Sequence, residues 1–172
     1  MRKAVFFDRD GVVNKRIVGG YVTTWDEFDW LPGIAETLRD VKDLGYLAII
    51  ITNQRGVGTG KMSEADLELI HSQLQEHLQR DGIAFDDIIS CTDATNDSSR
   101  RKPSPEMLFE AARKFDIDLS QSWMIGDSPT DIEAGTRAGT KTAFLINDHE
   151  QAPPDATIAL HHVHDIIAHL RP

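Results

Sequence analysis

The sequence has little cysteine and no long apolar run. Its single cysteine, Cys91, excludes an internal disulfide and a cysteine-rich metal site. The longest apolar run, residues 47–51, is far shorter than the roughly 20 residues that a membrane-spanning helix needs. The apolar stretch near the N-terminus is brief and ends at Asp8, so we expect no signal peptide. These features predict a cytoplasmic protein that does not associate with membranes.

Positive charge is also scarce. The chain has 18 Lys and Arg residues against 28 Asp and Glu residues, which gives a net charge of −10 and a pI near 5.0. Such a balance argues against a protein that follows a nucleic-acid backbone by bulk electrostatics. A bound metal and one local cation can still reverse the field of a single cleft. The composition therefore leaves room for an enzyme that acts on small anionic molecules.

The hydrophobic pattern predicts a doubly wound α/β fold. Short, almost continuously apolar segments are typical of parallel strands that are covered on both faces, and they occur at residues 4–7, 46–51, 87–91, 122–125, 142–146 and 157–160. Amphipathic stretches between them predict helices at residues 33–44, from Ser63 to just before Gly82, and at 105–115, 131–138 and 164–170. This alternation indicates a Rossmann-like three-layer sandwich around a parallel sheet, with residues 1–172 as a single domain.

Polar groups follow several of the predicted strands. Ligands of doubly wound sheets bind beyond the carboxyl ends of the strands, so side chains at these ends are candidates for the functional site. We expect them to converge at one edge of the sheet. The candidates are Asp8, Asp10, Thr52, Asn53, Gln54, Arg101, Lys102, Asp127 and Asp131.

The carboxylates among these candidates predict a magnesium site. Asp8 and Asp10 are two residues apart and would point the same way in an extended chain, and Asp127 would enter from a neighbouring strand. Three carboxylates at one point repel one another unless a cation holds them, and hard oxygen ligands suit Mg²⁺. Lys102 could offset Asp8 and bind a phosphoryl oxygen, and Thr52 supplies a hydroxyl group. Such a set suits nucleophilic attack on phosphorus with acid–base assistance.

Four segments carry a family resemblance. DRDGVVN, ITNQ, RKPSP and GDSPTD occur in this order over roughly residues 3–146, and they resemble the four motifs of the haloacid dehalogenase-like (HAD) phosphatases. The resemblance implies Asp8 as the nucleophile and Asp10 as the general acid/base. It implies Mg²⁺ bound by the Asp8 side chain, the Asp10 backbone carbonyl and Asp127.

The same resemblance assigns the remaining candidates. Thr52 and Lys102 would bind phosphate, and Asp131 would be a supporting acid.

HAD enzymes often carry a cap domain, but the segments between the motifs are filled by predicted core elements and leave no room for one. Loop 14–31, which contains Tyr21, Trp25 and Trp30, is the candidate flap over the site.

One branch of the family fits best. DRDGVVN, TNQRGVGTGK and RRKPSPEM look most like the histidinol-phosphate and heptose-bisphosphate phosphatases, in which Asn53, Gln54 and Arg101 would lie near the substrate. Arg55 is a further candidate contact. The branch often has a Cys/His zinc loop before the third motif, but CTDATNDSSR has one cysteine and no histidine, so we expect no structural zinc. The first expected substrate is a heptose bisphosphate and the second is histidinol phosphate.

Other interpretations remain. TNQRGVGTGK and RKPSPEM also resemble polynucleotide 3′-phosphatases, against which the net charge of −10 counts. A non-catalytic phosphate-binding regulatory module is a second alternative, and a mutase or transferase is a third. The presence of both Asp8 and Asp10 favours catalysis. The glycine-rich segment 56–62 lacks the P-loop spacing and is expected to be a turn that leads to Ser63.

Overall fold

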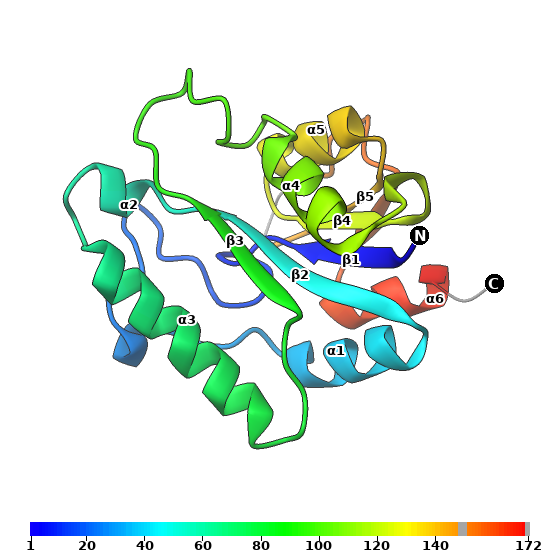
Figure 1. Cartoon of the computed structure of the whole chain (residues 1–172), viewed down its shortest axis with the longest axis horizontal. Helices are drawn as coiled ribbons and strands as arrows, with labels where there is room; N and C mark the ends of the chain where they lie inside the picture. The colour runs from blue at the N-terminus through cyan, green and yellow to red at the C-terminus, as the bar shows by residue number, and fades with distance from the viewer. Residues whose placement is uncertain (148–150, 171–172) are drawn as a thin grey trace.

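A computed structural model describes residues 1–147 and 151–170 of the chain as a parallel sheet between layers of helices (Figure 1). The six strands lie in the order β3-β2-β1-β4-β5-β6, and each neighbouring pair is parallel. Their bounds are β1 (Lys3–Phe7), β2 (Tyr46–Asn53), β3 (Asp87–Cys91), β4 (Trp123–Gly126), β5 (Lys141–Leu145) and β6 (Ile158–Leu160). Within residues 1–147 and 151–170, no helix is long and apolar enough to span a bilayer.

The helices form two layers. Helices α1, α3 and α6 cover one face of the sheet and α4 and α5 cover the other (Figure 1). Buried residues of α1, α3, η3 and α6 belong to one hydrophobic cluster, and those of α4 and α5 belong to the other. The helical segments are η1 (Trp25–Glu27), α1 (Ile34–Asp43), α2 (Arg55–Gly58), α3 (Glu64–Gln79), α4 (Glu106–Phe115), η2 (Leu119–Gln121), α5 (Pro129–Ala138), η3 (Val163–Ile166) and α6 (Ile167–Leu170).

Strand β1 shows why the sequence is apolar without alternation. Val5 and Phe7 belong to the hydrophobic cluster on one face of the sheet, whereas Ala4 and Phe6 belong to the cluster on the other, and all four are fully buried. Successive side chains of a strand point to opposite faces, so a strand between two helical layers needs apolar residues throughout. The predicted doubly wound, three-layer α/β fold is thus confirmed.

Three predicted segments differ from the structure in their start or in the type of helix or turn that they form. The helix expected at 131–138 begins at Pro129, because proline fits the first helical turn and the Asp131 carboxylate accepts a hydrogen bond from the backbone N–H of the N-cap residue Ser128. The expected helix at 164–170 is a 3₁₀ segment followed by the short α6. Segment 56–62 was expected to be a turn, but α2 places Arg55–Gly58 in one helical turn before the chain reaches Ser63.

The strand order places the end of β1 at a special position. The chain runs from β1 to β2 and β3 on one side, and then returns to β4, β5 and β6 on the other side of β1. Doubly wound sheets bind ligands at this switch point, outside the carboxyl ends of the strands. The residues that follow β1, β2 and β4 are therefore the first to examine for function.

Candidate active site

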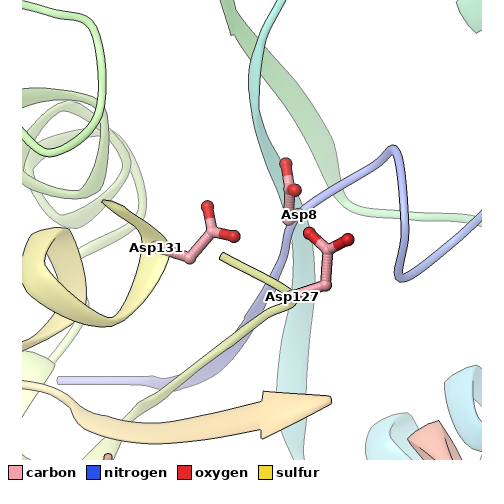
Figure 2. A group of neighbouring side chains, drawn as sticks. All are labelled: Asp8, Asp127 and Asp131. Atoms are coloured by element: carbon pink, nitrogen blue, oxygen red, sulfur yellow. The ribbon is translucent and has the colours of Figure 1, made fainter. Parts of the chain in front are cut away.

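Three carboxylates meet at the switch point. Asp8 directly follows β1, Asp127 directly follows β4, and Asp131 lies in the first turn of α5. The backbone N–H of Asp8 donates to the carbonyl of Ile125 at 2.9 Å, which ties the end of β1 to β4. One oxygen from each carboxylate lies within 4.8 Å of the others, and Figure 2 shows the three side chains gathered at the strand ends. The structure thus brings Asp8 and Asp127 together.

Two glycines make this close approach possible. A Cβ atom at Gly11 would lie 1.9 Å from Oδ2 of Asp127, and one at Gly126 would lie 2.1 Å from Cβ of Asp131. Gly11 also has a φ of +95°, which other residues rarely adopt. Any side chain at either position would displace one of the carboxylates.

Lys102 is the buried cation of the cluster. Its Nζ lies 2.8 Å from Oδ1 of Asp8 and 2.6 Å from Oδ1 of Asp131, and it donates to the carbonyl of Ile51 at 2.8 Å. Burial would lower the pKa of Lys102, but the charges of Asp131 and Asp8 outweigh burial and raise that pKa above its usual value. Lys102 is therefore charged at neutral pH.

One lysine does not balance the acidic cluster. Burial raises the pKa of Asp8 well above its usual value, and repulsion from Asp131 and Asp127 adds to this effect, while Lys102 opposes it. Full ionisation of Asp8 therefore calls for a further cation beside it. The oxygen-rich donor set fits a hard divalent ion such as Mg²⁺.

Asp131 has a supporting position. Its Oδ1 pairs with Lys102, and its Oδ2 accepts hydrogen bonds from the backbone N–H of Ser128 at 3.1 Å and from the Ser128 hydroxyl at 2.9 Å. Both carboxylate oxygens are thus engaged, one with the lysine and one with the helix cap. Asp131 is well placed to hold Lys102 against Asp8.

Asp10 reaches the site by a different route from the one the sequence predicts. Strand β1 ends at Phe7, so strand alternation does not extend to Asp10, which lies in a turn closed by a hydrogen bond from Gly11 N–H to the Asn14 carbonyl at 2.7 Å. Asp8 and Asp10 both line one cavity. The Asp10 carboxylate nevertheless lies outside the cluster that Asp8, Asp127 and Asp131 form.

Three donors hold the Asp10 carboxylate. Oδ1 accepts from Arg9 and from Asn14, each at 3.0 Å, and Oδ2 accepts from Gln54 at 2.8 Å. Burial would raise the pKa of Asp10, but the charge of Arg9 and these hydrogen bonds outweigh burial and lower that pKa. Asp10 is therefore a fixed, ionised carboxylate in the free protein.

Residues at and just after the end of β2 hold other residues of the site in place through hydrogen bonds. Gln54 also donates to the hydroxyl of Thr52 at 2.9 Å, and Thr52 is fully buried and does not line the cavity. The Asn53 side chain donates to the carbonyl of Lys102 at 3.1 Å and accepts from its N–H at 3.0 Å. Asn53 therefore fixes the backbone that carries the buried lysine.

The cavity above these residues has a volume of about 620 Å³. Its lining includes Asp8, Asp10, Asp127 and Asp131, the cations Arg101 and Lys102, and residues 16–22. Nη1 of Arg101 is buried without a hydrogen-bond partner among the described residues, so it is available to a ligand. Arg55, in contrast, is exposed on α2 and does not line the cavity, so its expected substrate contact has no support in this arrangement.

Loop 14–31 divides into two parts. Tyr21 lines the cavity. Trp25 stacks on Phe28 with ring centroids 4.8 Å apart, and Trp30 meets the edge of Phe28 at 5.0 Å. Both tryptophans pack against the hydrophobic core, so they support the loop and do not form a platform for a ligand.

Several residues of the site carry no clear sequence signal. Arg9 lies between two aspartates and would be expected at the surface, yet it is fully buried. Arg16 places Nη1 3.7 Å from Oδ2 of Asp127, and Asn147 donates to the carbonyl of Gly11 at 3.1 Å. Of these three residues, Asn147 alone has a possible sequence signal, because it follows another strand, β5.

Hydrogen bonds organise the loop before Lys102. The Ser98 hydroxyl donates to Asp93 and accepts from the backbone N–H groups of Arg100 and Arg101, each at 3.2 Å, and it lies 3.7 Å from Sγ of Cys91. This arrangement fixes the segment that leads to Arg101. The absence of a structural zinc stays a prediction from the sequence.

Comparisons with known proteins agree with this geometry. A family model described as HAD-hydrolase-like matches residues 99–171. A D-glycero-beta-D-manno-heptose-1,7-bisphosphate 7-phosphatase of Rhodopseudomonas palustris is 39% identical over 80% of both chains. A D-glycero-alpha-D-manno-heptose-1,7-bisphosphate 7-phosphatase of Burkholderia mallei is 37% identical over 86% of this chain and 82% of its own. A crystal structure of the D,D-heptose 1,7-bisphosphate phosphatase from B. bronchiseptica, complexed with magnesium and phosphate, is 27% identical and covers 98% of this chain and 97% of its own, with a TM-score of 0.88.

The fold, the acidic strand ends and the buried lysine define an α/β phosphatase that acts on phosphoric monoesters. The chain belongs to the HAD-like phosphatases, in the branch that contains the heptose 1,7-bisphosphate phosphatases.

Proposed function

We propose that this phosphatase hydrolyses D-glycero-D-manno-heptose 1,7-bisphosphate through a phospho-aspartyl intermediate on Asp8. The observation that carries the reaction is the contact of Asp8 with the buried Lys102 beside the acidic cluster, at the floor of a cavity of about 620 Å³. The choice of substrate is supported by the relatives, which are named heptose bisphosphate phosphatases and match this chain over most of their length. Histidinol phosphate is the second candidate substrate.

Magnesium is the proposed cofactor. The side chains of Asp8 and Asp127 and the backbone carbonyl of Asp10 would hold it, because they offer the hard oxygen donors that Mg²⁺ prefers. When bound, the ion would neutralise negative charge on the phosphoryl group. The related structure with magnesium and phosphate supports this proposal.

The residues of the chain divide the chemistry between them. A carboxylate oxygen of Asp8 forms a bond to phosphorus while the ester P–O bond breaks. Asp10 is ionised in the free protein, so it takes up a proton from solvent when the anionic substrate binds beside it, and it gives this proton to the leaving oxygen. Water then attacks the phosphorus of the intermediate, its proton passes to Asp10, and Asp8 is regenerated as phosphate leaves. Lys102 supplies a fixed positive charge next to Asp8 throughout.

A panel of phosphate esters tests the substrate. Because relatives are named for both the alpha and the beta anomer, both anomers of the heptose bisphosphate belong in it, with histidinol phosphate and a 3′-phosphorylated oligonucleotide. We expect kcat/KM for one heptose anomer to exceed that for the other esters by about tenfold or more, since polar pocket groups left unpaired by a wrong substrate reduce transition-state binding.

Two results would contradict the proposal. Faster hydrolysis of the oligonucleotide would favour a polynucleotide 3′-phosphatase, against which the net charge of −10 counts. No turnover of any ester in the presence of Mg²⁺ would favour a non-catalytic phosphate-binding module. A cytoplasmic location remains a prediction from the sequence.

Magnesium should stabilise the folded protein. Binding to the native state alone stabilises it by RT ln(1 + [L]/Kd), or about 2.7 kcal/mol when Mg²⁺ is present at 100 times its Kd. Differential scanning fluorimetry with a Mg²⁺ titration measures the rise in Tm. Asp127→Asn should remove most of that rise, whereas Asp155→Asn, an exposed site away from the cavity, should keep it. An equal Mg²⁺ effect in both variants would place the ion elsewhere.

A further inference from the structure

Arg9 links the proposed acid/base residue to a distant helix. It is fully buried, and its Nη2 lies 3.0 Å from Oδ1 of Asp10. Its Nη1 lies 3.1 Å from Nε2 of His71, a residue of α3 that is 62 positions away in the chain. The carboxylate, the guanidinium and the imidazole therefore form one connected chain of side chains behind the cavity.

The chemistry of arginine fixes the state of His71. A guanidinium has only donors, so Nε2 of His71 must be the acceptor of this hydrogen bond. The imidazole is then neutral and carries its proton on Nδ1. Burial and the neighbouring charge of Arg9 lower the pKa of His71 to about 3, which agrees with a neutral ring at any working pH.

The position of His71 is set by the core. Helix α3 is anchored by Leu67, Ile70 and Leu74, which are at most 4% exposed and belong to the main hydrophobic cluster. The core thus fixes the backbone position from which the His71 side chain extends. The backbone of Arg9 is also restrained, because its carbonyl accepts hydrogen bonds from the N–H groups of the next turn, including that of Val13 at 2.8 Å.

We propose that His71 is a positioning residue for the phosphatase reaction: it holds the Arg9 guanidinium, which in turn holds the Asp10 carboxylate at the cavity wall. This inference rests on the proposed role of Asp10. Arg9 has two Nη groups and each meets one partner, so loss of the His71 acceptor frees one end of the guanidinium. The Asp10 carboxylate would then lose the fixed orientation that proton transfer to a leaving oxygen requires.

A matched pair of variants isolates the hydrogen-bond acceptor. His71→Gln can place an amide oxygen near the position of Nε2, whereas His71→Leu removes the acceptor and keeps an apolar side chain of similar bulk. His161→Gln is the control, because His161 is exposed at the end of β6, away from the cavity. Circular dichroism and thermal unfolding check that each variant folds. His71→Asn, whose amide is too short to reach Arg9, replaces the leucine variant if that one does not fold.

The readout compares two leaving groups. A sugar phosphate needs a proton on its leaving oxygen, whereas 2,4-dinitrophenyl phosphate does not, and kcat/KM reports the first phosphoryl transfer for both. We expect His71→Leu to lose about tenfold in kcat/KM on the sugar phosphate and less than about twofold on the dinitrophenyl ester. His71→Gln should recover most of the loss, and His161→Gln should match the wild type.

Each other outcome overturns the inference. An equal loss on both esters would show a packing role for His71, and no loss on either would show no role at all. A glutamine variant as poor as the leucine variant would show that the acceptor is not what matters. If the wild-type protein hydrolyses neither ester with Mg²⁺, the proposed function itself fails, which is distinct from failure of the His71 link.

Discussion

Asp8→Asn should reduce turnover by about a thousandfold or more, because the amide cannot form the bond to phosphorus that we propose for the carboxylate. The same substitution should leave the protein at least as stable as the wild type in Mg²⁺-free buffer. Burial and the charge of Asp131 raise the pKa of Asp8, so its ionised form is disfavoured in the folded state at neutral pH. A neutral amide removes that penalty and can still accept a hydrogen bond from Lys102.

Phosphate release and thermal unfolding measure the two effects separately. Asp81→Asn, at an exposed residue after α3, is the matched control and should behave as the wild type in both assays. Retention of a tenth or more of the wild-type rate by Asp8→Asn would refute nucleophilic attack by Asp8. A marked fall in Tm would show that the loss of activity came from unfolding and not from the missing nucleophile.

Lys102→Met should destabilise the protein by about 3–5 kcal/mol, as expected when one partner of a buried ion pair is removed. Asp8 and Asp131 lose the cation that lies 2.8 and 2.6 Å from them, and both remain buried. This is a large share of the roughly 5–15 kcal/mol that stabilises a typical domain. Turnover should also fall, because the fixed charge next to the nucleophile is gone.

Urea unfolding measures this loss, with Lys61→Met as the control at an exposed lysine. Adding Asp8→Asn to Lys102→Met should restore part of the lost stability, because one unpaired carboxylate becomes neutral. An unfolding midpoint for Lys102→Met equal to that of the wild type would mean that water or another group already neutralises the cluster. A double variant less stable than the single one would contradict the charge argument.

The sequence predicts the layers of the fold and the acidic edge for one reason. Parallel strands place their carboxyl ends together, so residues that directly follow strands, such as Asp8 and Asp127, can be located from the strand pattern alone. Lys102 lies further along the chain from the preceding strand, β3, but the motif RKPSP predicts that it belongs to the same site as the two aspartates. The family resemblance named these residues independently of the strand pattern.

Contacts that depend on loop conformation could not be predicted in the same way. Arg9, a charged residue between two aspartates, is expected at the surface from its sequence. Its burial depends on the turn that contains Asp10 and on the distant helix α3, which contains His71. Arg55 looks like a neighbour of the site in the sequence, but the short α2 helix leaves its side chain exposed outside the cavity. The sequence around Trp25 is equally compatible with ligand binding and with packing, and the stacking of Trp25 on Phe28 indicates packing.

The position of β1 between β2 and β4 has a consequence for synthesis of the protein on the ribosome. A nascent chain that has emerged only through α4 already contains Asp8 and Lys102, but it lacks the strand that carries Asp127 to them. The acidic edge is then incomplete, and one side of the central strand has no neighbour. We therefore expect catalytic competence to arise late in translation, once the second half of the sheet has docked against the first.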